Sequence, residues 1–243
     1  MGTKLDPVLQ SYLRSIRGSM KSTSISGNSR PDPYLNRIDI LDIWANELQE
    51  NEACQQLFQE LVIDSFSTVF FSYSGLYKYA NATLRSSLET ALRIAYFAFH
   101  PVEYQWWKKE KNWQSDTKNV WGNGYNYFIS IDKIENIDKK LKDAKLPGLF
   151  NGMYNIPSMY SVLSKSVHTL YSSLQTGHNN FSPNFDLSTF KKWSTMYGNV
   201  MSRINLLYIC VFEPEYSRLE AADKTKILDI GIASEKTKTT LGL

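Results

Sequence analysis

The chain has 243 residues, with 27 basic against 24 acidic side chains for a formal net charge of +3, and 42% of its residues are hydrophobic. A chain of this size buries a core without disulfides or a structural metal, and so small a net charge does not by itself indicate a nucleic-acid binder. Cys54 and Cys210 lie in apolar helical patterns, so we expect two buried thiols in a reducing compartment. The three histidines show no ligand spacing, and no apolar run approaches the ~18 residues of a membrane span. We therefore expect a cytoplasmic protein without a membrane segment, metal or cofactor.

The N-terminal residues predict a helical arm and a linker. Apolar residues over 5–16 recur at the spacing of one helical face, and Gly18 is placed to end the helix. Residues 18–33 are rich in Ser, Gly, Asn and Pro, which indicates a flexible segment. Residues 1–33 are therefore predicted to be an N-terminal helix followed by a flexible linker.

A helical bundle is predicted over residues 34–215, and its first part is acidic. Helical periodicity extends over residues 38–70, and residues 41–70 contain six acidic and no basic side chains. The strongest apolar pattern of the chain follows over residues 76–99. Pro101 marks its end because proline cannot donate to the helical hydrogen-bond ladder.

The second part of the bundle is interrupted and then resumes. Residues 102–157 form a predicted insertion, with a Trp/Lys-rich segment, a Gly-Asn-Gly turn and a charged stretch. A helix is expected over residues 158–174, with Ser158 as its N-cap. A long helix over residues 187–211 follows, with Asp186 as its N-cap.

The C-terminal residues 216–243 predict one more helix, over residues 219–233, and a frayed Lys/Thr-rich tail. The sequence contains no strand alternation, internal repeat or sustained heptad. The predicted fold is therefore all-α, an irregular helical bundle with an N-terminal helical arm and an inserted Trp/Lys-rich segment.

Two polar clusters stand out on the apolar helical patterns. Arg85 and Glu89 lie one turn apart, either as an ion pair at the rim of the core or as a rigid guanidinium that grips a phosphate. Ser164, Lys165 and His168 form the second cluster. Its histidine is either a structural side chain or a base that abstracts the 2′-hydroxyl proton of RNA.

The runs Leu84 to Arg93 and Leu163 to His168 resemble the two core helices of HEPN-like proteins, which are prokaryotic helical-bundle proteins of toxin–antitoxin, abortive-infection and antiviral (antiphage) defence systems. The resemblance covers roughly residues 55–210. It implies a bundle that forms a homodimer and, in active members, a metal-independent endoribonuclease site at the dimer interface. On this reading His168 is the general base and Glu89 orients Arg85. Arg85 and Lys165 stabilise phosphate charge, and Ser164 lines the same cavity.

The sequence departs from the family pattern just before this histidine. Active members carry an arginine that is separated from this histidine by four to six intervening residues, but residues 161–163 are Ser, Val and Leu. A literal match occurs instead at Arg93 and His100, which is the second candidate pair. The missing arginine favours an alternative hypothesis, in which the chain is an inactive HEPN-like bundle. Such a bundle would bind a partner protein or nucleic acid as an accessory or sensor subunit.

The inserted segment interleaves lysines with aromatic residues. Lys108, Lys109, Lys111 and Trp113 have the combination that stacks bases and follows phosphates in single-strand binders. The same pattern suits an amphipathic cover whose indoles pack on the bundle while its lysines remain in water. The expected partners are therefore RNA, a second copy of the chain, and an antitoxin or another protein of a defence system.

Overall fold

The computed structural model describes residues 7–26, 31–109, 123–152, 154–167, 185–232 and 234–243. Within these ranges the chain forms twelve α-helices and one π-helix and no strand, which confirms the all-α fold. In the same ranges, no helix combines the length and the apolar character that crossing a bilayer requires.

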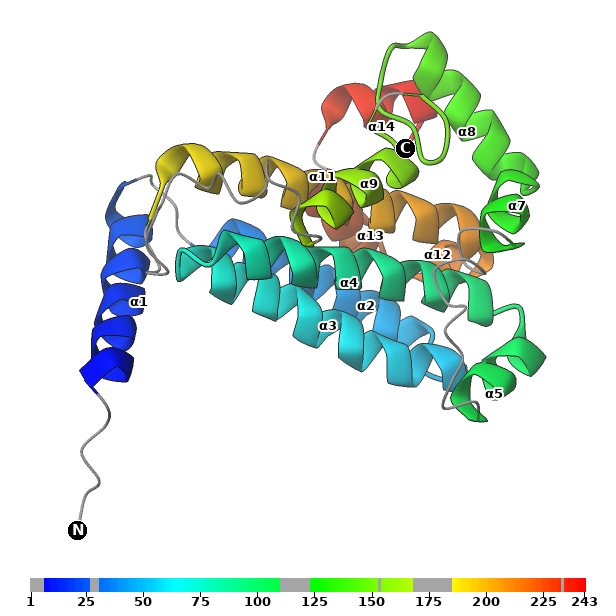
Figure 1. Cartoon of the computed structure of the whole chain (residues 1–243). Coiled ribbons are helices and arrows are strands. Elements are labelled where there is room, and N and C mark those ends of the chain that lie inside the picture. The colour runs from blue at the N-terminus through cyan, green and yellow to red at the C-terminus, as the bar shows by residue number, and fades with distance from the viewer. Residues whose placement is uncertain (1–6, 27–30, 110–122, 153, 168–184, 233) are drawn as a thin grey trace.

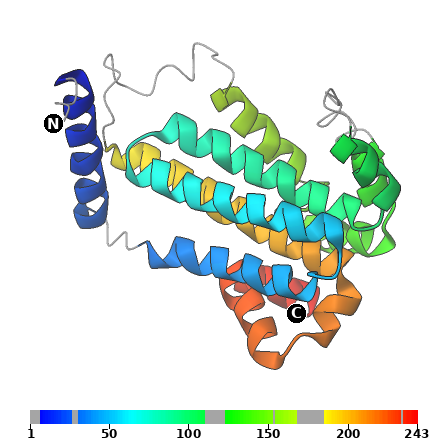
Figure 2. The same cartoon turned by 90° about the horizontal axis from the view of Figure 1, so that it is seen from below.

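The centre of the bundle is helix α4 (Tyr77–Phe97), which packs against α3 (Glu52–Tyr73), α9 (Ile156–Val167) and α11 (Leu187–Val211). Figures 1 and 2 show α3 and α4 side by side along the length of the bundle. Alanines of α4 that are buried against these neighbours allow the close packing. Helix α2 (Asp32–Glu47) covers the other side of α3.

Large aromatic side chains fill the core and find polar partners there. The indole of Trp44 donates to Asn205 Oδ1 at 3.1 Å, and the indole of Trp193 donates to Thr68 Oγ1 at 3.2 Å. Both indoles are fully buried, and a buried N–H without an acceptor costs about 1–3 kcal/mol. Much of the aromatic content of the sequence is therefore core.

Side-chain caps decide where several helices begin. Asp186 accepts from the backbone N–H of Thr189, which confirms the predicted N-cap of α11. Asn51 caps α3, so residues 38–70 form two helices separated by a turn and not one continuous helix. The prediction of Ser158 as a cap was wrong, because the side chain of Asn155 accepts from the backbone N–H of Ser158.

The N-terminal arm is longer than the sequence predicted. Helix α1 extends over Pro7–Ser26, so the expected end at Gly18 and a linker over residues 18–26 were wrong. A Cβ at Gly18 would meet nothing within 4 Å, so this glycine marks no close approach of another segment. The hydroxyl of Thr23 donates to the backbone oxygens of Ser19 and Tyr73, which holds the C-terminal half of α1 at the end of α3.

The predicted insertion contributes helices α5 (Pro101–Lys109), α7 (Asn123–Ile129) and α8 (Asp132–Asp143). Beyond α8, a loop is held by the carboxylate of Asp138, which accepts the backbone N–H groups of residues 149–151 over 2.5 to 3.0 Å. Isoleucines of α8 are buried, so this part of the insertion belongs to the core.

The C-terminal residues form short helices and no single long one. They comprise α12 (Glu213–Arg218), α13 (Ala221–Lys226), the π-helix η1 (Ile227–Ile232) and α14 (Glu235–Leu241). Predictions of one helix over residues 219–233 and of a frayed tail were therefore wrong.

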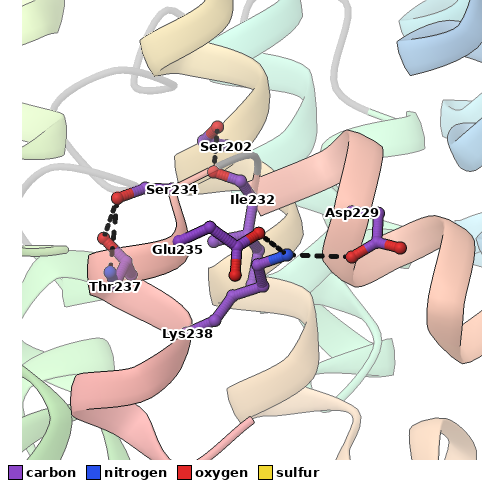
Figure 3. A network of polar contacts seen from close by, with 7 residues as sticks. All are labelled: Ser202, Asp229, Ile232, Ser234, Glu235, Thr237 and Lys238. Carbon is purple, nitrogen blue, oxygen red and sulfur yellow. Dashed lines mark hydrogen bonds and ion pairs between the residues drawn. The ribbon is translucent and has the colours of Figure 1, made fainter.

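Polar contacts explain why the tail is ordered (Figure 3). Lys238, whose side chain is 10% exposed, pairs with Asp229 at 2.8 Å and with Glu235 at 2.5 Å. Ser234 caps α14 by accepting from Thr237, and Ser202 of α11 donates to the oxygen of Ile232. These contacts join the end of the chain to α11.

Candidate functional site

The first polar cluster lies in the seam where α4 packs against α9. Arg85 Nε donates to Glu89 Oε1 at 2.9 Å, and Arg85 Nη2 donates to the hydroxyl of Tyr160 on α9 at 2.6 Å. The guanidinium carbon lies 4.8 Å from the centre of the Tyr160 ring, which adds a cation–π contact. Arg85 is thus fixed in orientation by one side chain of its own helix and one of the neighbouring helix.

The network continues along α4 towards α5. The second oxygen of Glu89 lies 3.7 Å from Arg93 Nη2, and the guanidinium of Arg93 lies 6.0 Å from the centre of the Trp107 ring. The side chains of Arg85, Glu89 and Arg93 are 16–20% exposed, so water reaches the network. One carboxylate therefore faces two guanidinium groups, and solvent screens these charges only in part.

Two ionisable groups near Glu89, one on α3 and one on α9, have raised pKa values. Burial raises the pKa of Asp64 on α3, and repulsion from Glu89 adds to this effect, while Ser86 and Arg93 oppose it. Burial and then the charge of Glu89 raise the pKa of Tyr160. Tyr160 therefore remains a phenol at neutral pH and acts as a hydrogen-bond donor or acceptor, not as a general base.

The second cluster is described only in part. Ser164 lies one turn after Tyr160, and its hydroxyl is buried without a hydrogen-bond partner among the described residues. Lys165 lies in the last turn of α9 and is exposed. His168 lies outside the described residues, so the structure gives no position for the predicted base.

Within the described residues, Arg93 and His100, the second candidate pair, contact different residues and not each other. Nδ1 of His100 lies 2.7 Å from the backbone oxygen of Tyr96, and its ring stacks on Tyr96 at 4.0 Å. The ring of Tyr127 makes a T-shaped contact with the imidazole, at 4.7 Å between ring centres, and also lies 5.6 Å from the ring of Tyr96. No contact of the described residues joins Arg93 to His100, and the aromatic partners of the imidazole indicate a structural role.

The Trp/Lys-rich segment is tied to the bundle at its first residues. Lys108 pairs with Glu52 at the start of α3 at 2.7 Å, and this pairing raises the pKa of Lys108. Lys109 is exposed, whereas Lys111 and Trp113 lie outside the described residues. Lys108 is therefore part of a contact between α5 and α3.

No family model, curated protein or solved structure matches the chain. Among the described residues, no group of three or more His, Cys, Asp or Glu side chains has an arrangement that could hold a metal ion.

Sequence reasoning found Arg85 and Glu89 but missed two of their neighbours. Tyr160 precedes Ser164 by one turn, so helical spacing alone would have placed it on the same face as the predicted cavity. Asp64 was counted only as part of an acidic face, because no pattern within one helix reveals which carboxylate lies against Ser86 of another helix.

Proposed function

We propose that the chain is a HEPN-like protein of a prokaryotic antiphage-defence or toxin system, which cleaves RNA in the cytoplasm as a metal-independent homodimer. One observation carries the proposal. The two helices that bear the family-like motifs, α4 and α9, pack against each other, and Arg85 reaches across the seam to Tyr160. Arg85 and Tyr160 are 75 positions apart in sequence, and they meet on the surface of α9, which ends at Val167, the residue before His168.

The proposed reaction uses the RNA itself as nucleophile. His168 accepts the proton of a 2′-hydroxyl, and the freed oxygen attacks the adjacent phosphorus. The bond between phosphorus and the 5′-oxygen breaks, and the leaving oxygen takes up a proton from solvent water, to which the His168 imidazolium later returns its own proton. The products are a 2′,3′-cyclic phosphate and a 5′-hydroxyl. Arg85, oriented by Glu89, and Lys165 stabilise the charge that develops on the phosphate.

A second candidate function is an inactive binding subunit of a defence complex. A specific contact favours it: Glu89 lies within 4 Å of both Arg85 and Arg93, so these guanidinium groups already have an anionic partner. Such a seam is held together by its own charges, and a phosphate would have to compete with Glu89 for them.

RNA cleavage in the presence of EDTA separates the two functions. Purified full-length protein is incubated with total RNA beside the variants His168→Ala and His100→Ala. We expect cleavage to disappear with the first substitution and to persist with the second, because His100 is held by Tyr96 and Tyr127. Cleavage that survives His168→Ala would exclude the proposed base, and no cleavage by the unmodified protein would favour the binding subunit.

A further inference from the structure

An apolar ridge lies exposed on the outer side of α3. Ile63 is 63% exposed, Phe66 50% and Phe70 52%, and they follow one another at helical spacing. Through Phe71 the ridge continues to Tyr79 at the start of α4, which is 57% exposed, with ring centres 5.7 and 5.8 Å apart. Contiguous apolar surface of this kind marks an interaction site more often than isolated exposed residues do.

Helix α1 lies at one end of the bundle, and its N-terminal half projects from it (Figures 1 and 2). Figures 1 and 2 show α1 at the end of the bundle, across the direction of α3 and α4. Among the side chains of α1 that the structure describes, Ser19 and Thr23 in the C-terminal half are buried, whereas Leu13 in the N-terminal half is 37% exposed. The apolar positions Leu9, Leu13 and Ile16 recur at helical spacing, so this half carries an amphipathic pattern.

The charges of the two surfaces are complementary. Helix α1 contains Arg14, Arg17 and Lys21 and no acidic residue, and all three side chains are exposed. Helix α3 contains no basic residue, and its Glu60 is exposed one turn before Ile63. The other two acidic residues of α3 have partners within the chain, because Glu52 pairs with Lys108 and Asp64 lies against Ser86 of α4. Opposite charge of this kind steers association and disfavours the pairing of like surfaces.

The lengths also agree. The ten residues from Pro7 to Ile16 span about 15 Å as a helix, and the seven steps from Ile63 to Phe70 span about 10 Å. The half of α1 that projects from its own bundle is therefore long enough to cover the ridge.

We propose that two copies of the chain exchange their arms, so that the apolar stripe of α1 from each copy lies along the ridge of α3 in the other. The contact is reciprocal, which makes a closed two-fold dimer. The basic side chains of the arm then lie near Glu60, which is exposed beside the ridge. This inference goes beyond the proposed function, because it defines a dimer contact that does not depend on the chemistry of the α4–α9 seam.

Disulfide trapping tests the contact directly. One preparation carries Leu13→Cys and another Phe66→Cys, and the two are mixed under mild oxidation. The native thiols do not interfere, because burial raises the pKa of both Cys54 and Cys210 to about 12. We expect a covalent dimer only in the mixture. The matched control replaces Phe66→Cys by Val162→Cys, a 48% exposed position on α9, and should give no covalent dimer.

The mass of the unmodified chain in sedimentation measures the same contact without a cross-link. We expect a dimer whose dissociation constant rises at least about tenfold in Phe66→Ser/Phe70→Ser and in Arg14→Glu/Arg17→Glu. Adding Glu60→Arg to the second variant should restore part of the affinity. Circular dichroism melting checks that each variant is folded, as expected for substitutions at exposed positions.

Several outcomes would overturn the arm exchange. They are a monomer at all concentrations, a dimer unaffected by either pair of substitutions, or cross-linking of Phe66→Cys to itself but not to Leu13→Cys. Arm residues that bind anionic vesicles in place of a second copy would also contradict it. Because these readouts record mass and not RNA cleavage, the arm exchange and the proposed function can fail separately.

Discussion

Two arginines of the bundle, Arg85 and Arg203, illustrate opposite ways of placing a guanidinium inside a helical protein. Arg85 lies in the α4–α9 seam, is 20% exposed and has Glu89 and Tyr160 as partners. Arg203 lies on α11, is 5% exposed, and its Nε is buried without a hydrogen-bond partner among the described residues. Burial lowers the pKa of Arg203 to about 10, and the charge of Asp138 opposes this shift.

The surroundings of Arg85 allow an anion to bind, whereas Arg203 lies inside the core and has a structural role. The seam holds oriented charges that water reaches, so a phosphate could enter and exchange partners with Glu89. The opposing charge that acts on Arg203 is that of Asp138, which already accepts three backbone N–H groups of the loop after α8. Exposure and available partners, and not the presence of arginine alone, distinguish a candidate binding site here.

The largest effect is expected at Asp138. In Asp138→Asn the carboxylate that accepts from Leu149, Phe150 and Asn151 is replaced by an amide with one acceptor oxygen. We expect the free energy of unfolding to fall by about 3 kcal/mol, because hydrogen bonds to a buried charged group are lost. Urea unfolding measures it beside Glu135→Gln, an exposed position of α8. A loss no larger than that of the control would contradict the structural role of Asp138.

At Arg203, in contrast to Asp138, we expect a substitution to cause no loss of stability. Arg203→Met keeps most of the volume and removes the buried cation, so we expect the free energy of unfolding to stay unchanged or to rise by about 1 kcal/mol. Lys192→Met, at an exposed position of α11, is the matched control in the same urea experiment. A fall of several kcal/mol would show that the charge of Arg203 is needed near Asp138, and the contrast with Arg85 would then be lost.

The smallest effect on stability is expected at Asp64, and it depends on pH. Its pKa is raised in the folded state by burial, so between the unfolded and folded pKa values the folded protein binds more protons. Stability therefore falls as the pH rises through this window, and at neutral pH the ionised group is a cost. We expect Asp64→Asn to be slightly more stable than the parent at neutral pH and to lose this advantage at acidic pH. Thermal unfolding from pH 4 to 7 tests it, and an advantage that grows towards acidic pH would contradict it.

Local sequence signals predicted most helices but not their breaks. Asp186 before a long apolar pattern identified the start of α11, and proline and periodicity located α4. Gly18 was misread because a glycine ends a helix only where the fold requires it, and contacts of Thr23 with Tyr73 favour continuation. The order of the tail depends on the ion pair between Lys238 of α14 and Asp229 of η1. No local sequence pattern reveals that these two residues are in contact.

The candidate site shows the same limit. Helical spacing placed Arg85 beside Glu89, and their ion pair is present. The contact with Tyr160 depends on how α9 crosses α4, which follows from packing of both helices with the rest of the core. The role of His168 stays a prediction.

The cleavage rate of a defined RNA by Arg85→Ala in EDTA tests the proposed function most directly. Arg85 is held at the seam by Glu89 and Tyr160, and removing one group that stabilises transition-state charge typically costs about 100-fold or more in rate. We expect a loss of that size, with products ending in a 2′,3′-cyclic phosphate, while Arg218→Ala at an exposed position of α12 leaves the rate unchanged. An unchanged rate in Arg85→Ala would contradict the account.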